Sequence, residues 1–370
     1  MSDPDATRVA VVGAGAVGVT AARDLAERDA AVDLYDRGKL GGGSTERAAG
    51  IVYDAFAEDV DVEVAARSME RFRALSGTGD FRLSTTPYLW FCTDEGDAET
   101  LRSQVRGMRR HDRDVELVDT DRVRREFPVL RVSDLAAAAV ARTAGVADPL
   151  AYVEAVATAA RDAGATLHLD TPASVALDPP RVNGEAYDAV VVTAGAWTPR
   201  VLAEAGVSVP VAAYRVQAAV LDGPAVPIFY DATAGYYVSP HALGLLAGDG
   251  VDGRPADPDG FDGSADDEFV AATRDRLERR LVNADLPVER SWAGVCTATP
   301  DRDPLVGELE DGLYVGVGWH GHGFMRAPAV GERLAQQVLG ERAGLAPFDP
   351  TRFDGDERID LPGADAGERD

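Results

Sequence analysis

The sequence predicts an α/β fold built around a parallel sheet, and three observations support this prediction. An apolar run over 8–12 is followed by a glycine-rich turn and by a helical pattern that continues to Leu25. A second apolar run covers 31–35. A third, over 187–193, is apolar almost throughout, as strands inside a parallel sheet usually are. Strand and helix patterns that alternate in this way favour βαβ units.

The turn after the first apolar run has the spacing Gly-x-Gly-x-x-Gly at Gly13, Gly15 and Gly18. The first glycine allows a tight turn, the second lets the backbone approach a pyrophosphate, and the third lets helix and strand pack closely. Unpaired N–H groups at the start of the next helix can bind phosphate. Asp36 ends the second strand, where an acid accepts hydrogen bonds from an adenosine ribose. In this order the features predict a dinucleotide site, with an ordinary βαβ unit as the alternative.

The later elements alternate in a similar way, but not without interruption. Helices are predicted over 60–75, 98–110, 149–163 and 265–282. The third of these has Asp148 as its N-cap and Pro149 at its first position. Residues 210–250 alternate as strands broken by glycine and proline, and 250–264 are predicted to form a solvated loop.

These elements predict two domains that are each discontinuous in sequence. The parallel elements recur in 1–80, 145–208 and 290–345, which we assign to the first domain. The intervening 81–144 and 209–289 are assigned to a second, mainly antiparallel α+β domain. The acidic stretch 354–370 is predicted to be a disordered tail.

The charge of the chain excludes several classes of partner. Its 370 residues carry a net charge of −26, and Lys39 is the only lysine among 37 basic residues. A field this negative repels nucleic acid and anionic membranes, and the dispersed acids are typical of adaptation to high salt. No apolar run approaches the ~18 residues of a membrane span. Two cysteines, Cys92 and Cys296, are too few for a disulfide framework, so we expect a cytoplasmic protein.

A last strand is predicted over 313–318, and it leads through a Gly-His-Gly-Phe sequence at 321–324 into a helix. Together with the glycine motif, this block resembles the superfamily of FAD-dependent amine oxidoreductases that contains D-amino-acid oxidase, glycine oxidase and sarcosine oxidase. Further blocks follow in the same order at 43–50, 193–197 and 292–307. The resemblance covers nearly all of the chain apart from the acidic tail. It implies a Rossmann-type FAD-binding domain with a second, mainly antiparallel α+β substrate domain.

The resemblance also implies which residues surround a non-covalently bound FAD and which act on the substrate. The expected FAD-binding residues are Gly13, Ala14, Gly15, Ala16, Val17, Gly18, Asp36, Arg37, Ser44, Thr45, Arg47, Ala48, Ala49, Val175, Ala194, Gly195, Trp197, Gly321, His322, Gly323, Phe324 and Met325. The expected catalytic residues are Arg47, Tyr237, His322 and Arg326. Backbone N–H groups near Gly323 to Met325 would stabilise negative charge on the reduced flavin.

Two departures from the family pattern bear on the substrate and on the flavin linkage. Many members that oxidise D-amino acids or glycine have an arginine for the substrate carboxylate where this chain has Cys296. Arg47, Arg215 or Arg326 could take its place, and a secondary or N-methylated amino acid fits better than a D-amino acid. The residues that bind flavin covalently in some members correspond here to Arg47 and Gly294, so the FAD is expected to be non-covalent.

A third departure bears on the electron acceptor. Some sarcosine oxidases use a lysine over the flavin to activate oxygen, whereas the single lysine here, Lys39, follows Asp36 near the adenosine end. This favours a dehydrogenase that passes electrons to an acceptor other than oxygen.

The sequence therefore predicts oxidation of a small amine or amino acid to an imine, by hydride transfer to flavin N5. One alternative is a hydroxy-acid dehydrogenase of the same fold, with His320 or His322 as its base. Another is a flavin-binding subunit of a larger dehydrogenase complex. The five histidines include no pair in a metal-ligand context, so no metal is expected.

Overall fold

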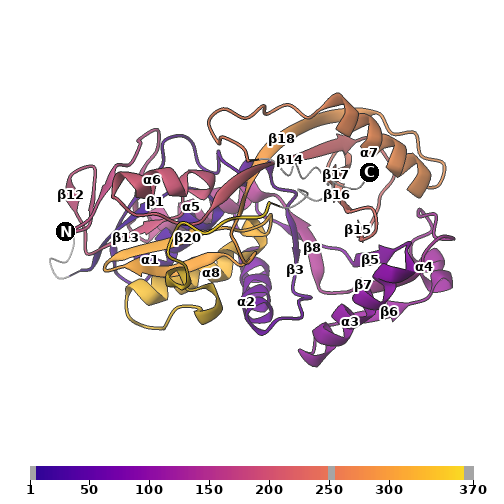
Figure 1. The fold of residues 1–370 in the computed structure, drawn as a ribbon, viewed down its shortest axis with the longest axis horizontal. Coiled ribbons are helices and arrows are strands. Elements are labelled where there is room, and N and C mark those ends of the chain that lie inside the picture. The colour runs from indigo at the N-terminus through magenta and orange to yellow at the C-terminus, as the bar shows by residue number, and fades with distance from the viewer. Residues whose placement is uncertain (1–5, 249–254, 362–370) are drawn as a thin grey trace.

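The computed structural model describes residues 6–248 and 255–361, and two large sheets organise them (Figure 1). The first sheet has six strands in the order β19-β20-β13-β1-β2-β9. These are β1 (Arg8–Val12), β2 (Ala31–Tyr35), β9 (Thr166–His168), β13 (Ala189–Val192), β19 (Leu305–Glu310) and β20 (Leu313–Val317). Neighbouring strands are parallel except β19 and β20. The predicted α/β fold is confirmed.

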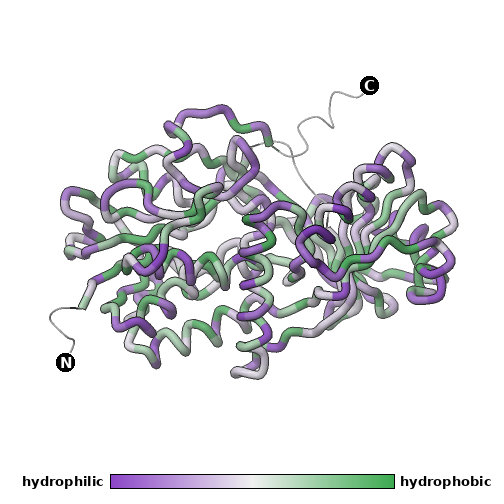
Figure 2. Tube along the Cα trace, turned by 90° about the horizontal axis from the view of Figure 1, so that it is seen from below, coloured by the Kyte–Doolittle hydropathy of each residue, from purple (hydrophilic) through white to green (hydrophobic). Residues whose placement is uncertain are grey.

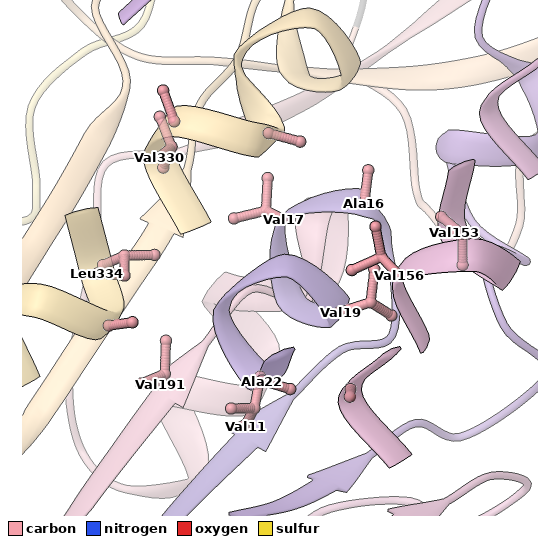
Figure 3. Packing of buried hydrophobic residues seen from close by; sticks show 14 of the residues in the cluster. Val11, Ala16, Val17, Val19, Ala22, Val153, Val156, Val191, Val330 and Leu334 are labelled. Carbon is pink, nitrogen blue, oxygen red and sulfur yellow. The ribbon is translucent and has the colours of Figure 1, made fainter. Parts of the chain in front are cut away.

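The main core lies on one face of this sheet, where helix α1 (Ala16–Ala26) packs between α5 (Pro149–Asp162) and α8 (Gly323–Val338). In Figure 3, Val17 lies on the side of α8, near Val330, and Val19 lies beside Val156 of α5. Small side chains on α1 allow this close packing, and a Cβ on Gly331 of α8 would lie 2.6 Å from Thr20 Cβ. Helix α2 (Asp59–Leu75) packs against the outer side of α8.

The opposite face of the sheet is also covered, which explains the uniformly apolar third strand. Val12, Val190 and Val192 pack there against Leu202 of α6 (Thr198–Glu204) and against a small antiparallel sheet. The strands of that sheet are β10 (Val175–Ala176), β11 (Arg181–Val182) and β12 (Glu185–Ala186).

The second large sheet has eight strands in the order β18-β14-β17-β16-β15-β5-β7-β6. These are β5 (Tyr88–Cys92), β6 (Val115–Val118), β7 (Ala137–Ala141), β14 (Ala212–Leu221), β15 (Ile228–Asp231), β16 (Tyr236–His241), β17 (Gly244–Gly248) and β18 (Val288–Ala298). Every neighbouring pair is antiparallel except β15 with β5. A three-stranded sheet of β3 (Ile51–Tyr53), β8 (Ala144–Ala147) and β4 (Leu83–Thr85) lies between the two large sheets (Figure 1).

Helices cover both faces of the second sheet. Helix α3 (Glu95–Arg110) packs on one face, and α4 (Thr120–Glu126) and α7 (Asp267–Arg280) pack on the other. In Figure 2 the peripheral segments are mostly hydrophilic and the central extended segments mostly hydrophobic. This is expected where each helix buries one of its faces against the sheet and exposes the other to water. Helix α3 starts earlier than the predicted residue 98, because the Asp94 carboxylate accepts the Gly96 N–H at 2.7 Å and caps it.

Other boundary predictions can be compared with the described residues. The predicted N-cap at Asp148 is confirmed, since its carboxylate accepts the N–H groups of Leu150 and Ala151. Strand β18, predicted with the first domain, hydrogen-bonds along β14 in the second sheet. The division into two domains stays a prediction.

The expected acidic tail is partly packed. Leu361 is buried against Tyr214 and Ala298, because β14 and β18 leave an apolar patch there, so 354–361 do not fit the expectation of disorder. Residues 362–370 of the expected tail, and residues 249–254, where the expected strand region ends and the expected loop begins, lie outside the described residues.

Candidate active site

One large cavity, of about 1490 Å³, lies between the two large sheets. It starts at the carboxyl ends of β1 and β2, passes the turn before α8, and continues along one face of the eight-stranded sheet. Pockets for one small molecule usually measure about 300–1,000 Å³. The cavity therefore has room for a large ligand and a second, smaller one.

The glycine motif forms one wall of this cavity, and its backbone geometry requires glycine. Gly13 has φ +108°, and a Cβ there would lie 2.6 Å from the carbonyl oxygen of Thr193. A Cβ on Gly18 would collide with the Gly13 carbonyl oxygen. Gly15 faces the cavity, where the nearest atom to a Cβ would be Thr45 Oγ1 at 3.3 Å. The predicted roles of tight turn and helix–strand packing agree with the contacts of Gly13 and Gly18, and the role of Gly15 in approaching a pyrophosphate stays a prediction.

The adjoining helix end suits a phosphate. Gly15 is the N-cap of α1, no side chain caps the helix, and its first turn has no acidic residue. The positive end of the helix dipole therefore faces the cavity, and the first turn of the helix contains no carboxylate that would oppose a phosphate there. The Thr45 hydroxyl accepts the Ala16 N–H at 3.2 Å and ties the loop 43–50 to this end.

Asp36 is positioned by the backbone of the same turn. Its Oδ2 accepts the Ala14 N–H at 2.7 Å, and its Oδ1 accepts the Gly38 N–H at 2.8 Å. A carboxylate has about four lone-pair sites, so both oxygens retain capacity for a hydroxyl donor in the cavity. The side chain therefore fits the hydrogen-bonding role predicted for a ribose.

Arg37 and Trp197 close the wall beside Asp36. The Arg37 guanidinium lies 4.3 Å from the centre of the Trp197 ring. Asp259 accepts the Trp197 Nε1–H at 2.8 Å, and it pairs with Arg37 at 2.8 Å and with Arg200. The loop 255–264, which belongs with the second sheet, is thus held against the segments that follow β2 and β13 of the first sheet.

The predicted flavin turn precedes α8 and is built from residues with left-handed backbone conformations. Gly318, His320 and Gly321 have φ of +88°, +46° and +86°. Helix α8 begins at Gly323, without an acidic residue in its first turn and without a side-chain cap. Its N–H groups and dipole point toward the cavity and can stabilise negative charge there.

The two histidines of this turn are neutral at neutral pH. Burial, and then the charges of Arg302 and Arg326, lower the pKa of His320 to about 4. Burial, and then Arg326, lower the pKa of His322 to about 4 as well. The Thr299 N–H donates to His320 Nε2 at 2.9 Å, and the Tyr53 hydroxyl lies 3.4 Å from His322 Nε2.

The three candidate arginines have different surroundings. Arg47 lines the cavity beside β18, where a Cβ on Gly294 would lie 3.2 Å from Arg47 Cδ, so the glycine leaves room for this side chain. Arg215 pairs with Asp266 at 3.0 Å, and Arg326 pairs with Asp61 in the core. Neither lines the cavity. The expectation that Arg326 meets a substrate is therefore wrong, because its guanidinium is neutralised inside the protein.

Tyr237 belongs to a row of residues that crosses the eight-stranded sheet. The pairings Trp292–Ala218, Ala218–Gly248, Gly248–Tyr237, Tyr237–Tyr230 and Tyr230–Trp90 form this row. Paired residues have side chains on the same face of a sheet, and every member except Gly248 lines the cavity. Tyr237 is the one member of this row among the predicted site residues. Alternation in the strands shows which residues share a face, but not that this face meets the cavity.

Most of the predicted site residues lie around this single cavity. Those that line it are Gly13, Gly15, Ala16, Val17, Asp36, Arg37, Ser44, Thr45, Arg47, Ala48, Ala49, Ala194, Gly195, Trp197, Tyr237, Gly321, His322, Gly323, Phe324 and Met325. Ala14 and Gly18 lie behind the wall and shape the turn. Val175, on β10 of the small sheet, packs into the core, and Pro172 and Ala173 line the cavity in its place.

Neither cysteine is set up as a nucleophile. Burial raises the pKa of Cys296 to about 11, and burial also raises the pKa of Cys92. Both thiols are free.

Within residues 6–248 and 255–361, no group of three or more histidine, cysteine, aspartate or glutamate side chains could hold a metal ion. In the same part of the chain, no helix has the length and apolar character needed to cross a membrane.

Known proteins resemble this chain over nearly its whole length. The monomeric sarcosine oxidase of Streptomyces avermitilis is 27% identical and covers 93% of this chain and 97% of its own. The L-proline dehydrogenase structure from P. horikoshii superposes with a TM-score of 0.85 at 27% identity, covering 95% and 99% of the two chains. The glycine oxidase structure from Geobacillus kaustophilus gives 0.82 at 25% identity, covering 94% and 100%.

A family model described as "FAD dependent oxidoreductase" matches residues 8–337. This range includes both the glycine motif and the turn before α8, which the structure brings to one cavity. The chain therefore belongs to the family of FAD-dependent oxidoreductases.

Proposed function

We propose that this protein oxidises a small amine or amino acid to an imine, with non-covalently bound FAD as its cofactor. The observation that carries the proposal is the continuity of one cavity from Asp36 through the turn before α8 to the aromatic row of the second sheet. A dinucleotide and a small substrate would then occupy the same cavity. The named activities of the relatives, on sarcosine, glycine and L-proline, support an amine or amino acid as the substrate.

The residues present fit FAD. The α1 N-terminus and Gly15 would bind the pyrophosphate, Asp36 would accept hydrogen bonds from the ribose, and Arg37 with Trp197 would flank the adenosine end. The first turn of α8 would lie at the flavin end. When bound, FAD supplies the two-electron acceptor for the reaction.

The protein's part in the chemistry is to orient the substrate and to control charge. The N–H groups at the start of α8 favour negative charge in front of them, and neutral His320 and His322 add no competing cation. Burial raises the pKa of Tyr53 to about 12, so this phenol stays neutral and can donate a hydrogen bond. The substrate amine reacts in its unprotonated form, and its N–H proton leaves to water. Water then hydrolyses the imine.

A carboxylate on the substrate would pair with Arg47, the cavity-lining arginine beside the second sheet. This arginine is partly covered by Phe261 and by the loop 43–50. A single, partly covered arginine suits a secondary or N-methylated amino acid better than a substrate that is recognised only through its carboxylate. The oxidation of a hydroxy acid would need a strong base, and histidines with a pKa of about 4 are weak bases.

We further infer an electron acceptor other than oxygen. Lys39, the single lysine, pairs with Glu46 at 2.6 Å beside the predicted adenosine end. The free thiols of Cys92 and Cys296 support a cytoplasmic location.

The test is anaerobic spectroscopy of the purified holoprotein in high salt, with amino acids, N-methyl amino acids and hydroxy acids as separate additions. We expect N-methyl amino acids to bleach the visible absorption of the flavin. Bleaching by hydroxy acids alone would select the alternative. Protein that stays colourless after FAD is added would refute the proposal.

A further inference from the structure

The cavity extends well beyond the space expected for FAD and a small amine, along helix α3. Asp97, Leu101, Gln104 and Met108 of α3 line it. Their spacing places them on one face of the helix. At 1.5 Å per residue, this wall is roughly 16 Å long. The cavity thus includes a channel beside α3. Figure 1 shows α3 next to β5 and β7.

The near end of the channel lies close to the predicted flavin turn. A Cβ on Gly107 would lie 2.8 Å from Ala57 Cβ, so the end of α3 touches the segment that precedes α2. Phe56 in this segment packs edge-on to His322, with ring centres 6.3 Å apart. Met108 therefore marks the end near the flavin turn.

The far end is fixed by a contact between α3 and the β15–β16 turn. The Thr233 hydroxyl donates to Asp97 Oδ2 at 2.7 Å, and its Oγ1 accepts the Thr93 N–H at 3.0 Å. Ala232 and Gly235 of the same turn also line the cavity. Asp97 is therefore held in place at this end, where it forms part of the channel lining.

Aromatic rings line the channel between these two ends. The Tyr88 and Trp90 rings lie 4.3 Å apart and are tilted by 32°, and Tyr53 packs edge-on to Trp90 at 5.7 Å. Tyr230 and Tyr237 continue the same face of the sheet. Aromatic faces attract cations and also accept apolar chains.

The charged side chains in the described lining of the cavity are basic in some parts and acidic in others. Its basic side chains are Arg37 and Lys39, which are paired near Asp36, and Arg47 beside β18. Beside α3 the charged lining residues are Asp97 and, at the start of α2, Glu58. This part of the cavity favours a positive ligand and disfavours an anion.

We propose that the channel beside α3 binds the tail of an elongated substrate, in which an apolar spacer joins the reacting amine to a second, cationic ammonium group. The spacer lies along the aromatic rings, and the ammonium group pairs with Asp97. This assignment rests on the proposed amine oxidation and adds the substrate class to it.

The test uses three series of N-methylated amines with spacers of increasing length, ending in methyl, ammonium or carboxylate. Binding to the holoprotein is measured anaerobically from the perturbation of the flavin absorbance, and reduction from its bleaching. We expect affinity to rise with spacer length in the ammonium series and to be weakest in the carboxylate series.

Two variants separate the tail from the reacting amine. Asp97→Asn keeps the size of the side chain, and it should weaken the ammonium series by roughly three- to tenfold while leaving short amines unchanged. Glu99→Gln is the matched control, because Glu99 lies on the same helix, pairs with Arg106 at 2.7 Å and does not line the cavity. Gln104→Trp, at an exposed position, should exclude long tails only.

The outcomes distinguish this assignment from the function on which it rests. Affinity that is independent of tail length and charge, or equal effects of Asp97→Asn and Glu99→Gln, would overturn the channel while short amines still bleach the flavin. If no amine bleaches the flavin, the proposed oxidation fails, and the absorbance perturbation by long ammonium compounds still decides whether the channel binds them.

Discussion

Asp36 offers a sharp test of the adenosine end of the site. In Asp36→Ala, the Ala14 and Gly38 N–H groups lose the carboxylate that they contact at 2.7 and 2.8 Å, and a bound ribose loses its acceptor. Hydrogen bonds to a charged group contribute about 1.5–3 kcal/mol each. Because water restores some of the lost hydrogen bonds, we expect the free energy of FAD binding to weaken by about 2–4 kcal/mol, which is roughly 30-fold to several hundred-fold in the dissociation constant.

The assay is titration of the apoprotein with FAD, followed by flavin fluorescence at constant salt. Asp36→Asn keeps one carbonyl acceptor and should fall between the wild type and Asp36→Ala. Asp33→Asn is the matched control, because this acid lies on β2 just before Asp36 but pairs with His168 at 2.7 Å and does not line the cavity. Equal dissociation constants for Asp36→Asn and Asp33→Asn would refute the reasoning.

Three further predictions concern packing, pH and salt. Gly18→Ala should lower the free energy of unfolding in urea by about 1–3 kcal/mol, whereas Gly15→Ala, with only a hydroxyl at 3.3 Å, should mainly weaken FAD binding; the reverse pattern would contradict the assigned roles. The pKa of His322 is about 4 in the folded protein and about 6.5 in the unfolded chain, so the unfolded chain binds an extra proton between these pH values, and the free energy of unfolding decreases as pH falls from 6.5 to 4. His322→Asn should make this decrease smaller in urea titrations. An unchanged dependence of the free energy of unfolding on pH would contradict this role of His322. Asp259→Asn removes an exposed pair with Arg37 and should speed FAD release about two- to fivefold at low salt in stopped-flow fluorescence, with the difference shrinking at high salt; a salt-independent difference would exclude an ionic role.

The arginines show where sequence reasoning reached its limit. Arg47, Arg215 and Arg326 were equivalent candidates for a substrate carboxylate, because nothing local distinguishes one guanidinium from another. Their partners do. Arg326 pairs with Asp61, which is 265 residues away, and Arg215 pairs with Asp266, whereas Arg47 pairs at 3.7 Å with the adjacent Glu46. Arg47 is the one of the three that lines the cavity, because Gly294 on a distant strand leaves it room.

The row of residues that crosses the eight-stranded sheet from Trp292 to Trp90 was partly predictable from the sequence. Alternation along β5 places Tyr88 and Trp90 on one face and Leu89 and Phe91 on the other. Both faces are apolar, so the pattern does not distinguish the one that packs against α4 and α7 from the one that lines the cavity. The choice depends on how the second sheet docks on the first.

The sequence by itself determined the features whose chemistry is local. The strand, the three glycines, the helix start and Asp36 follow one another within 8–36, and the turn before α8 lies within 318–323, so neighbouring residues fix their backbone geometry. It thereby predicted the fold class, the FAD cofactor of the family and most of the residues that the structure places around one cavity. Only the tertiary structure decided which side chains remain available to a ligand and that the cavity continues along α3. Those properties depend on charge pairing and packing between segments that are far apart in sequence, and no local pattern records them.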